Sequence, residues 1–101
     1  MFFALTASAE EPCRVIQGRA DFYSGDGQMF IWHIGTHHTF WVLDDASQER
    51  IFKYIPYTPE NEGMNSLFAD FTICPTEGYR RGASQFVIVK QIAHPKVRRV
   101  R

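Results

Sequence analysis

The sequence has little cysteine, no excess of either charge and no long hydrophobic run. Its 101 residues carry 11 Lys and Arg against 11 Asp and Glu, so the formal net charge is zero. A neutral chain argues against a polyelectrolyte partner that engages the whole surface, although it says nothing about local patches. No run approaches 18 apolar residues, so we expect no helix that spans a membrane. The length allows one domain.

The motifs of common catalytic and redox sites are also missing. The chain has no C-x-x-C pattern, so neither a dithiol redox motif nor a zinc knuckle is supported. It has no G-x-S-x-G, H-E-x-x-H or P-loop pattern either. We therefore expect no catalytic residues and no cofactor, and we predict that the protein is not an enzyme.

The apolar content predicts a folded protein instead. Hydrophobic residues make up 45% of the chain and aromatic residues 15%, which is enough for one small packed core. Alternating and β-branched residues predict five strands, which lie at residues 13–23, 29–34, 39–43, 67–74 and 85–92. The turn Ser24-Gly25-Asp26-Gly27 joins the first two strands into a hairpin.

The spacing of these strands predicts the fold class. Five or six short strands in a chain of this length indicate an all-β fold, a small antiparallel barrel or sandwich with one short helix. A barrel hides the edges of its sheet, and an oligonucleotide-binding-type barrel is one candidate topology. Asp45 is expected to cap the helix through residues 46–50, and residues 51–54 either extend the helix or form a short strand. The single β domain then covers residues 10–101 and ends in a basic tail.

The N-terminal residues resemble the end of an export signal. Residues 1–9 are mostly apolar and end in Ala7-Ser8-Ala9, which matches the A-x-A pattern of a signal-peptidase site. A basic region before the apolar stretch is missing, so we interpret these residues as the remnant of a signal peptide. The alternative is a disordered apolar N-terminus. Export predicts a periplasmic or secreted protein.

The two cysteines agree with export. Cys13 and Cys74 could form one disulfide in an oxidising compartment. The bridge would close a loop of about 60 residues, for which chain entropy predicts a stabilisation of roughly 4 kcal/mol. The alternative is two buried, reduced thiols that never meet, because spacing alone does not establish geometry.

Four short motifs suggest relatives of the chain. They are Gly18-Arg19, Tyr23-Ser24-Gly25, Ile31-Trp32-His33-Ile34-Gly35-Thr36 and Asp70-Phe71-Thr72-Ile73-Cys74-Pro75. With these motifs the chain resembles a group of small uncharacterised bacterial proteins that often carry export signals. The resemblance implies an exported protein but no mechanism. Members of the group tend to have a further cysteine in the last strand, near the place of Ile88 here, so their disulfide pairing need not transfer.

Three histidines are weak candidates for metal ligands. His33, His37 and His38 lie within six residues of one another, and neutral imidazole is a common metal ligand. A metal site needs three or four ligands that converge, whereas residues in a tight turn normally diverge. We therefore favour a polar turn with solvated imidazoles and expect no metal.

The charges are unevenly distributed along the chain. Residues 80–101 contain seven basic residues and no acid, whereas residues 44–79 contain seven acids and two bases. The basic tail, with Lys96, Arg98, Arg99 and Arg101, could contact phosphates, and together with surface aromatics it could bind single-stranded nucleic acid. We favour the alternative that this segment is a final strand or a solvated tail whose charges pair with the acidic segment.

Most strand aromatics are expected to belong to the core. They are Phe22, Tyr23, Phe30, Trp32, Phe40, Trp41, Phe68 and Phe71. The candidates for surface aromatics are Trp41, Tyr54 and Tyr57, the last of which lies in a long loop.

The leading hypothesis is an exported, non-catalytic binding or structural module of the cell envelope. Its partner would be an envelope protein or another envelope component. The predicted partner-binding residues are Tyr54, Tyr57, Met64, Arg80 and Arg81. The alternative is a cytoplasmic barrel that binds single-stranded nucleic acid through the basic tail.

Overall fold

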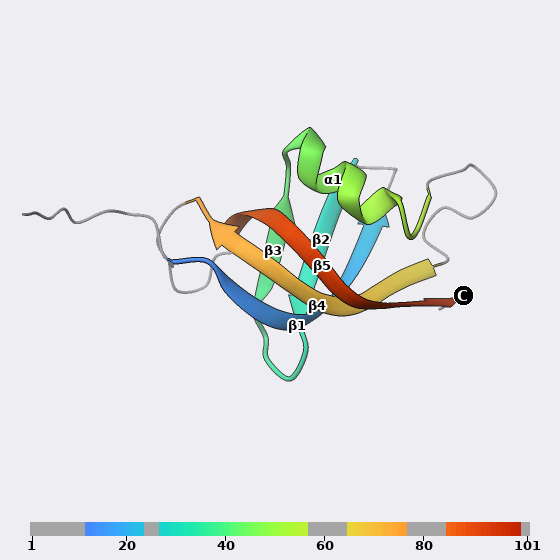
Figure 1. Ribbon diagram of the computed structural model, residues 1–101, viewed down its shortest axis with the longest axis horizontal. Helices are drawn as coiled ribbons and strands as arrows, with labels where there is room; N and C mark the ends of the chain where they lie inside the picture. The colour runs from blue at the N-terminus through green and yellow to red at the C-terminus, as the bar shows by residue number, and fades with distance from the viewer. Residues whose placement is uncertain (1–11, 24–26, 57–64, 77–84, 100–101) are drawn as a thin grey trace, which may run out of the picture.

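Five strands and one short helix make up most of the chain that the computed structural model describes, residues 12–23, 27–56, 65–76 and 85–99 (Figure 1). The elements are β1 (Arg14–Tyr23), β2 (Gln28–His33), β3 (Thr39–Val42), α1 (Asp45–Phe52), β4 (Asn65–Pro75) and β5 (Gln85–Arg99). The predicted all-β class with one short helix is confirmed. Among the described residues, no helix is long and apolar enough to cross a membrane.

The strands form a closed barrel in the order β1-β2-β3-β5-β4, and β1 also pairs with β4. All neighbouring strands are antiparallel except β3 and β5, which are parallel. The predicted antiparallel sheet is therefore a mixed one. The reason is geometric, because strand direction cannot alternate all the way round a closed ring with an odd number of strands. This order, with the helix between β3 and β4, is the topology of the oligonucleotide/oligosaccharide-binding (OB) barrel.

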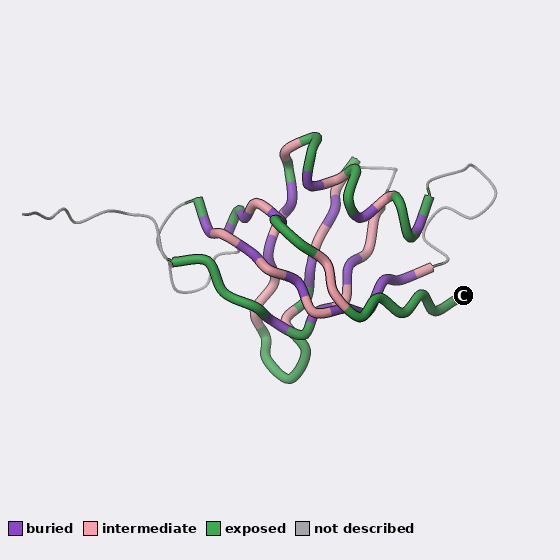
Figure 2. Tube along the Cα trace, in the orientation of Figure 1, coloured by how far each residue is buried: buried purple, intermediate pink, exposed green. Residues whose placement is uncertain are grey.

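The core lies inside the barrel, where every second residue of each strand points. This alternation shows in Figure 2 as buried segments that repeat along β1, β4 and the first half of β5. The buried apolar residues are Ile16, Ala20, Met29, Ile31, Phe40, Val42, Ile51, Ile55, Leu67, Ala69, Phe71, Ile73, Val87 and Val89. Ile51 is on α1, so the helix covers the core rather than standing apart from it.

The predicted hairpin of β1 and β2 is confirmed, with a register that runs from Gly18 opposite His33 to Tyr23 opposite Gln28. The expectation that most strand aromatics are core residues is wrong. Phe40 and Phe71 are fully buried, but Tyr23, Phe30, Trp32 and Trp41 lie on the outside. Both faces of β2 are apolar, so alternation alone does not say which face points inward.

The helix begins one residue earlier than the sequence predicts. Asp44, rather than Asp45, is the N-cap, and its carboxylate accepts a hydrogen bond from the Ser47 N–H at 3.0 Å. The helix continues to Phe52, so the first two residues of the ambiguous segment 51–54 are helical. Ile51 and Ser47 are its buried residues and direct the helix towards the barrel.

Strand β5 is much longer than predicted, because the basic tail continues the strand. It pairs with the beginning of β4, where Leu67 lies opposite Val97 and Ser66 opposite Arg98. The register shifts twice, once between Phe68 and Asp70 and once between Thr72 and Ile73. At the second shift Thr72 is opposite Gln91 and Ile73 is opposite Val89, so Lys90 is the extra residue of a bulge.

Where β3 ends, side chains of helix α1 replace it as hydrogen-bonding partners of the β5 backbone. The parallel pairing stops at Val42 opposite Val87. Two residues later the Val89 N–H donates to the Ser47 hydroxyl at 2.8 Å, and Arg50 Nε donates to the Val89 carbonyl at 3.1 Å. Two side chains of the helix thus satisfy backbone groups that a sixth strand would otherwise pair with.

A disulfide joins the start of β1 to the end of β4. The sulfur atoms of Cys13 and Cys74 are 2.10 Å apart, and their Cα atoms are 4.1 Å apart. The two cysteines lie one residue beyond the last paired residues, Arg14 and Ile73. The register of the strands thus places them opposite each other, and the predicted pairing is confirmed.

Gly18 allows the barrel to close tightly. A Cβ atom at this position would lie 2.6 Å from Ile31 Cγ2 and 2.9 Å from Phe71 Cδ2. Both neighbours are fully buried, so neither can move away without disturbing the core.

We predict that Gly18→Ala lowers the free energy of unfolding by about 1–3 kcal/mol, the usual cost of overpacking a core. Denaturant unfolding followed by circular dichroism measures this change. Gln17→Ala is the matched control, because Gln17 is exposed on the same strand and its loss should cost less than about 0.5 kcal/mol. An unchanged midpoint for Gly18→Ala would contradict the close contact.

We also predict that reduction of the disulfide raises the intact mass by two hydrogens and destabilises the fold by roughly 4 kcal/mol. The two cysteines are 61 positions apart in the sequence, so the unfolded chain gains much freedom when the bridge opens. Intact mass and unfolding are measured with and without reductant. Cys13→Ser with Cys74→Ser should be as unstable as the reduced protein and insensitive to reductant. Two free thiols in the unreduced protein would refute the bridge.

Candidate ligand-binding face

Four aromatic side chains form a row across the outside of the barrel. Tyr23 is on β1, Phe30 on β2, Trp41 on β3 and Phe86 on β5. The register places Phe30 opposite Trp41 and Trp41 opposite Phe86, so the row crosses the strands rather than following one of them. We call these four residues the aromatic row.

The rings of the aromatic row contact one another edge to face. The ring centroids of Tyr23 and Phe30 are 5.6 Å apart, and those of Phe30 and Trp41 are 4.5 Å apart. Trp41 and Phe86 are 6.5 Å apart. Such pairs contribute about 0.5–1.5 kcal/mol beyond the area that they bury. The two ends are nevertheless open, because Tyr23 is 40% exposed and Phe86 is 39% exposed. The row is therefore a preorganised apolar surface.

An apolar cleft extends the row beyond Phe86. Its volume is about 310 Å³, and it is lined by Leu43, Asp44, Thr76, Phe86, Val87 and Ile88. Leu43 is the most exposed apolar residue in this cleft, at 56%. The cleft gives the row a recess that could hold one end of a ligand.

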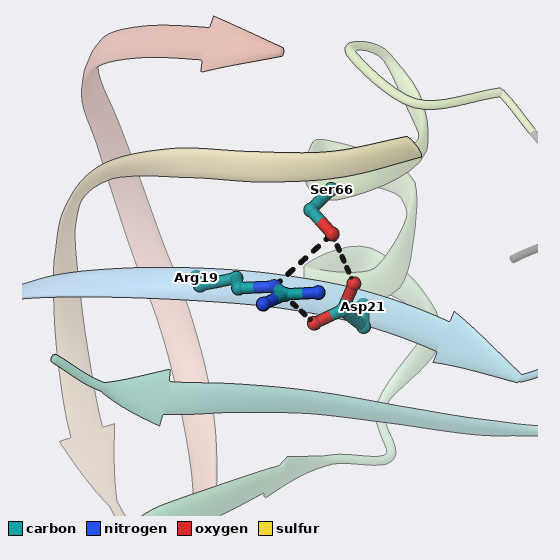
Figure 3. Close-up of polar contacts among 3 residues, drawn as sticks. All are labelled: Arg19, Asp21 and Ser66. Carbon is teal, nitrogen blue, oxygen red and sulfur yellow. Dashed lines mark hydrogen bonds and ion pairs between the residues drawn. The ribbon is translucent and has the colours of Figure 1, made fainter. Parts of the chain in front are cut away.

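The aromatic row carries little net charge. Asp21 lies opposite Phe30, but its carboxylate is 3.0 Å from Arg19 Nε and accepts a hydrogen bond from the Ser66 hydroxyl (Figure 3). Arg19 Nε also lies 3.1 Å from Ser66 Oγ, so three residues from β1 and β4 form one polar cluster. Among the described residues, neither Lys nor Arg is a direct cross-strand partner of the row.

A second row alternates aromatic and cationic side chains. Arg19 lies opposite Trp32 on one side and Phe68 on the other, and Phe68 lies opposite Lys96. The guanidinium carbons of Arg19 and Arg98 are each 5.8 Å from the Phe68 ring centroid, within the range of cation–π attraction. We call these five residues the cation–aromatic row.

A cleft of about 440 Å³ adjoins the cation–aromatic row. It is lined by Gln17, Gly18, Ile34, Phe68, Ala69, Asp70, His94 and Lys96. In it, His94 Nδ1 lies 2.9 Å from the Asp70 carboxylate. His94 has a positive φ of 54° and sits in the irregular part of β5 where the register shifts.

The turn between β2 and β3 positions the indole of Trp32. The Trp32 indole N–H donates to the Thr36 carbonyl at 2.7 Å, and the Thr36 hydroxyl donates to the His33 carbonyl at 2.8 Å. Within the described parts of the chain, no group of three or more His, Cys, Asp or Glu side chains could hold a metal. The candidate set of His33, His37 and His38 therefore gains no support there.

The structure describes one of the five predicted partner-binding residues. Tyr54 is 37% exposed and lies just after α1, apart from both rows, in a cleft with Arg50 and Lys90. The other four, Tyr57, Met64, Arg80 and Arg81, lie outside the described residues. Arg101 of the basic tail and the predicted export-signal segment, residues 1–9, also lie outside them.

The sequence prediction found Trp41 as a surface aromatic but missed its neighbours in the row. Phe30 and Phe86 were hard to tell from core residues, because β2 and the first half of β5 are apolar on both faces. Two signals were present. Tyr23 shares its face of β1 with Gln17, Arg19 and Asp21. In β2, Phe30 and Trp32 share one face, and the smaller Met29 and Ile31 share the other. A small barrel accepts the smaller set inside more easily.

Comparison with known proteins adds no further assignment to these surfaces. No family model, no curated protein and no solved structure matches the chain. The surfaces are therefore interpreted from their own chemistry and from the strand topology.

Proposed function

We propose that this protein is an exported, non-catalytic binding module of the cell envelope and that the aromatic row is its ligand surface. The observation that carries the proposal is the row itself, four ordered aromatic rings on the outside of one sheet. Exposed apolar patches on small proteins mark binding sites more often than chance, since water contact with them is unfavourable.

Export is supported by the disulfide and by the N-terminal sequence. A bridge between Cys13 and Cys74 persists in oxidising compartments and is rare in a reducing cytosol. The A-x-A pattern at Ala7-Ser8-Ala9 points to the same compartment. The resemblance to small exported bacterial proteins agrees with both.

The ligand that suits this surface best is an uncharged glycan chain of the envelope. A sugar ring has an apolar face that packs on an aromatic ring, and a chain of sugars could cross the four strands along the row. A nucleic acid would need cations beside the aromatics to neutralise its phosphates. The direct partners of the row that the structure describes supply no such cation.

The topology supports the same face by analogy. OB barrels bind oligonucleotides and oligosaccharides on the face formed by strands 2 and 3 and the adjoining loops. In this chain β2 and β3 contribute Phe30 and Trp41, the two central residues of the row. The fold alone suits either class of ligand, and the chemistry of the row favours a glycan.

We predict that Trp41→Ala weakens glycan binding at least tenfold, because the central ring of the row is lost. The probes are a soluble oligomer of β-linked N-acetylglucosamine, measured by calorimetry, and purified peptidoglycan, measured by co-sedimentation. Phe68→Ala is the matched control, since Phe68 is an aromatic of the other row and its loss should leave binding unchanged. The proposal fails if neither probe binds or if Trp41→Ala binds as well as the native protein.

A second candidate function rests on the cation–aromatic row. Trp32, Arg19, Phe68 and Lys96 are consecutive neighbours across four strands, and Arg98 stacks on Phe68. Aromatic rings for stacking and cations for phosphates are the two elements that single-stranded nucleic acid requires. The alternative function would therefore use this row together with the basic tail.

We expect a salt-titrated gel shift with oligo(dT) to decide this second candidate. If the second candidate is correct, Lys96→Gln reduces the steepness of log affinity against log salt concentration by about one unit, because one phosphate contact is lost. Phe68→Ala then weakens binding at every salt concentration, whereas Trp41→Ala does not. This row is ruled out as a nucleic-acid site if no gel shift occurs at low salt, or if the shift is the same for Lys96→Gln, Phe68→Ala and the native protein.

A further inference from the structure

A basic cleft lies between the C-terminal end of α1 and the middle of β5, apart from both rows. Its volume is about 190 Å³, and it is lined by Arg50, Lys53, Tyr54, Lys90, Gln91 and Ile92. Three of these six residues are cations, and none is an acid. The cleft is large enough for a phosphate group with part of the molecule that carries it.

The three cations of the cleft are not neutralised by the described part of the protein. The ion pairs there are Arg19 with Asp21 and His94 with Asp70, and neither involves a residue of the cleft. Like charges that converge without a counter-charge repel one another and destabilise the fold. An anion in the cleft would remove that repulsion.

A hydrogen bond fixes the Arg50 guanidinium, and the backbone sets where the side chains of Lys90 and Lys53 leave their elements. Arg50 Nε donates to the Val89 carbonyl at 3.1 Å, which fixes the guanidinium against β5. Lys90 is the extra residue of the β5 bulge, a feature that redirects a side chain from the regular alternation of a strand. The Lys53 N–H, at the C-cap, donates to the Glu49 carbonyl at 3.1 Å.

A favourable interaction with the helix dipole explains only part of this arrangement. Cations near the C-terminus of a helix are stabilised by its partial negative charge, which applies to Arg50 and Lys53. Lys90 belongs to the strand and gains its position from the bulge. The cleft differs from an ordinary helix end because cations from both α1 and β5 line it.

We propose that this cleft binds a phosphate monoester. The Arg50 guanidinium and the Lys53 and Lys90 ammonium groups would donate to its oxygens, since charge-assisted hydrogen bonds to phosphate are strong and Arg and Lys both make them. Tyr54 and Ile92 would contact the group that carries the phosphate. The site is independent of the proposed glycan surface, because the two share no residue.

The first test is an NMR titration of the ¹⁵N-labelled protein at low salt with inorganic phosphate, glucose 6-phosphate and glucose. We expect both phosphates to shift the amides of residues 50–54 and 89–92, with tighter binding of the ester, and glucose to shift none of them. Lys53→Gln and Lys90→Gln should each weaken phosphate binding several-fold, and together at least tenfold. Arg14→Gln is the matched control, an exposed basic residue of β1 that belongs to neither row and lies outside the cleft.

The variants are chosen so that they do not destabilise the fold. Arg50 is left unchanged because its side chain hydrogen-bonds the backbone of β5, whereas no side-chain hydrogen bond is present for Lys53 or Lys90 within the described residues. The proposal is overturned if millimolar phosphate shifts none of these amides, or if the double variant binds phosphate as the native protein does. A failure of glycan binding would not contradict phosphate binding in the cleft, and a failure of phosphate binding would not contradict the glycan surface.

A second arm identifies the source of the phosphate monoester. Vesicles of phosphatidylcholine with phosphatidic acid present the group on a membrane, and co-sedimentation that needs Lys53 and Lys90 would assign it to a lipid headgroup. Binding of glucose 6-phosphate without co-sedimentation would assign it to a soluble ester. Co-sedimentation that survives the double variant counts against the cleft.

Discussion

The architecture depends on one short parallel contact between β3 and β5. A ring of five strands cannot alternate in direction throughout, so closing it requires one parallel pair, and here that pair has only three residue positions, from Phe40 opposite Gln85 to Val42 opposite Val87. Where β3 ends, the backbone of β5 needs new partners, and α1 supplies them through Ser47 and Arg50. The same short contact brings Trp41 next to Phe86 and thereby completes the aromatic row.

The interior of the barrel is small, and this explains why so many aromatics lie outside. Gly18 leaves no room for even one carbon atom beside Ile31 and Phe71. Phe40 and Phe71 are the large rings that the interior holds fully buried. The four rings of the aromatic row pack against one another on the outside, where their contacts contribute stability and the two ends stay accessible. Core packing and the candidate ligand surface are therefore two consequences of one constraint.

Three surfaces of the described barrel differ in the ligand that they suit. The aromatic row is apolar, and its direct cross-strand partners among the described residues include neither Lys nor Arg, which favours an uncharged chain. The cation–aromatic row joins Arg19 and Arg98 to Phe68, a combination suited to stacked bases and phosphates. The basic cleft beside α1 gathers three cations without an acid and suits a single phosphate group. Because the surfaces share no residue, substitutions can separate their contributions.

The sequence alone determined the elements and the class of this protein. Strand alternation predicted five strands, the Gly-rich turn predicted the hairpin, and the acidic residues before the helix predicted its start to within one residue. The candidate site was largely hidden, because strands that are apolar on both faces do not reveal which face points inward. Only the tertiary structure decided that Phe30 and Phe86 face outward and that β3 and β5 run parallel. It also decided that Cys13 meets Cys74, since the register of β1 against β4 brings together residues 61 positions apart. These features depend on the closure of the ring, which is a property of the whole chain and leaves no local pattern in it.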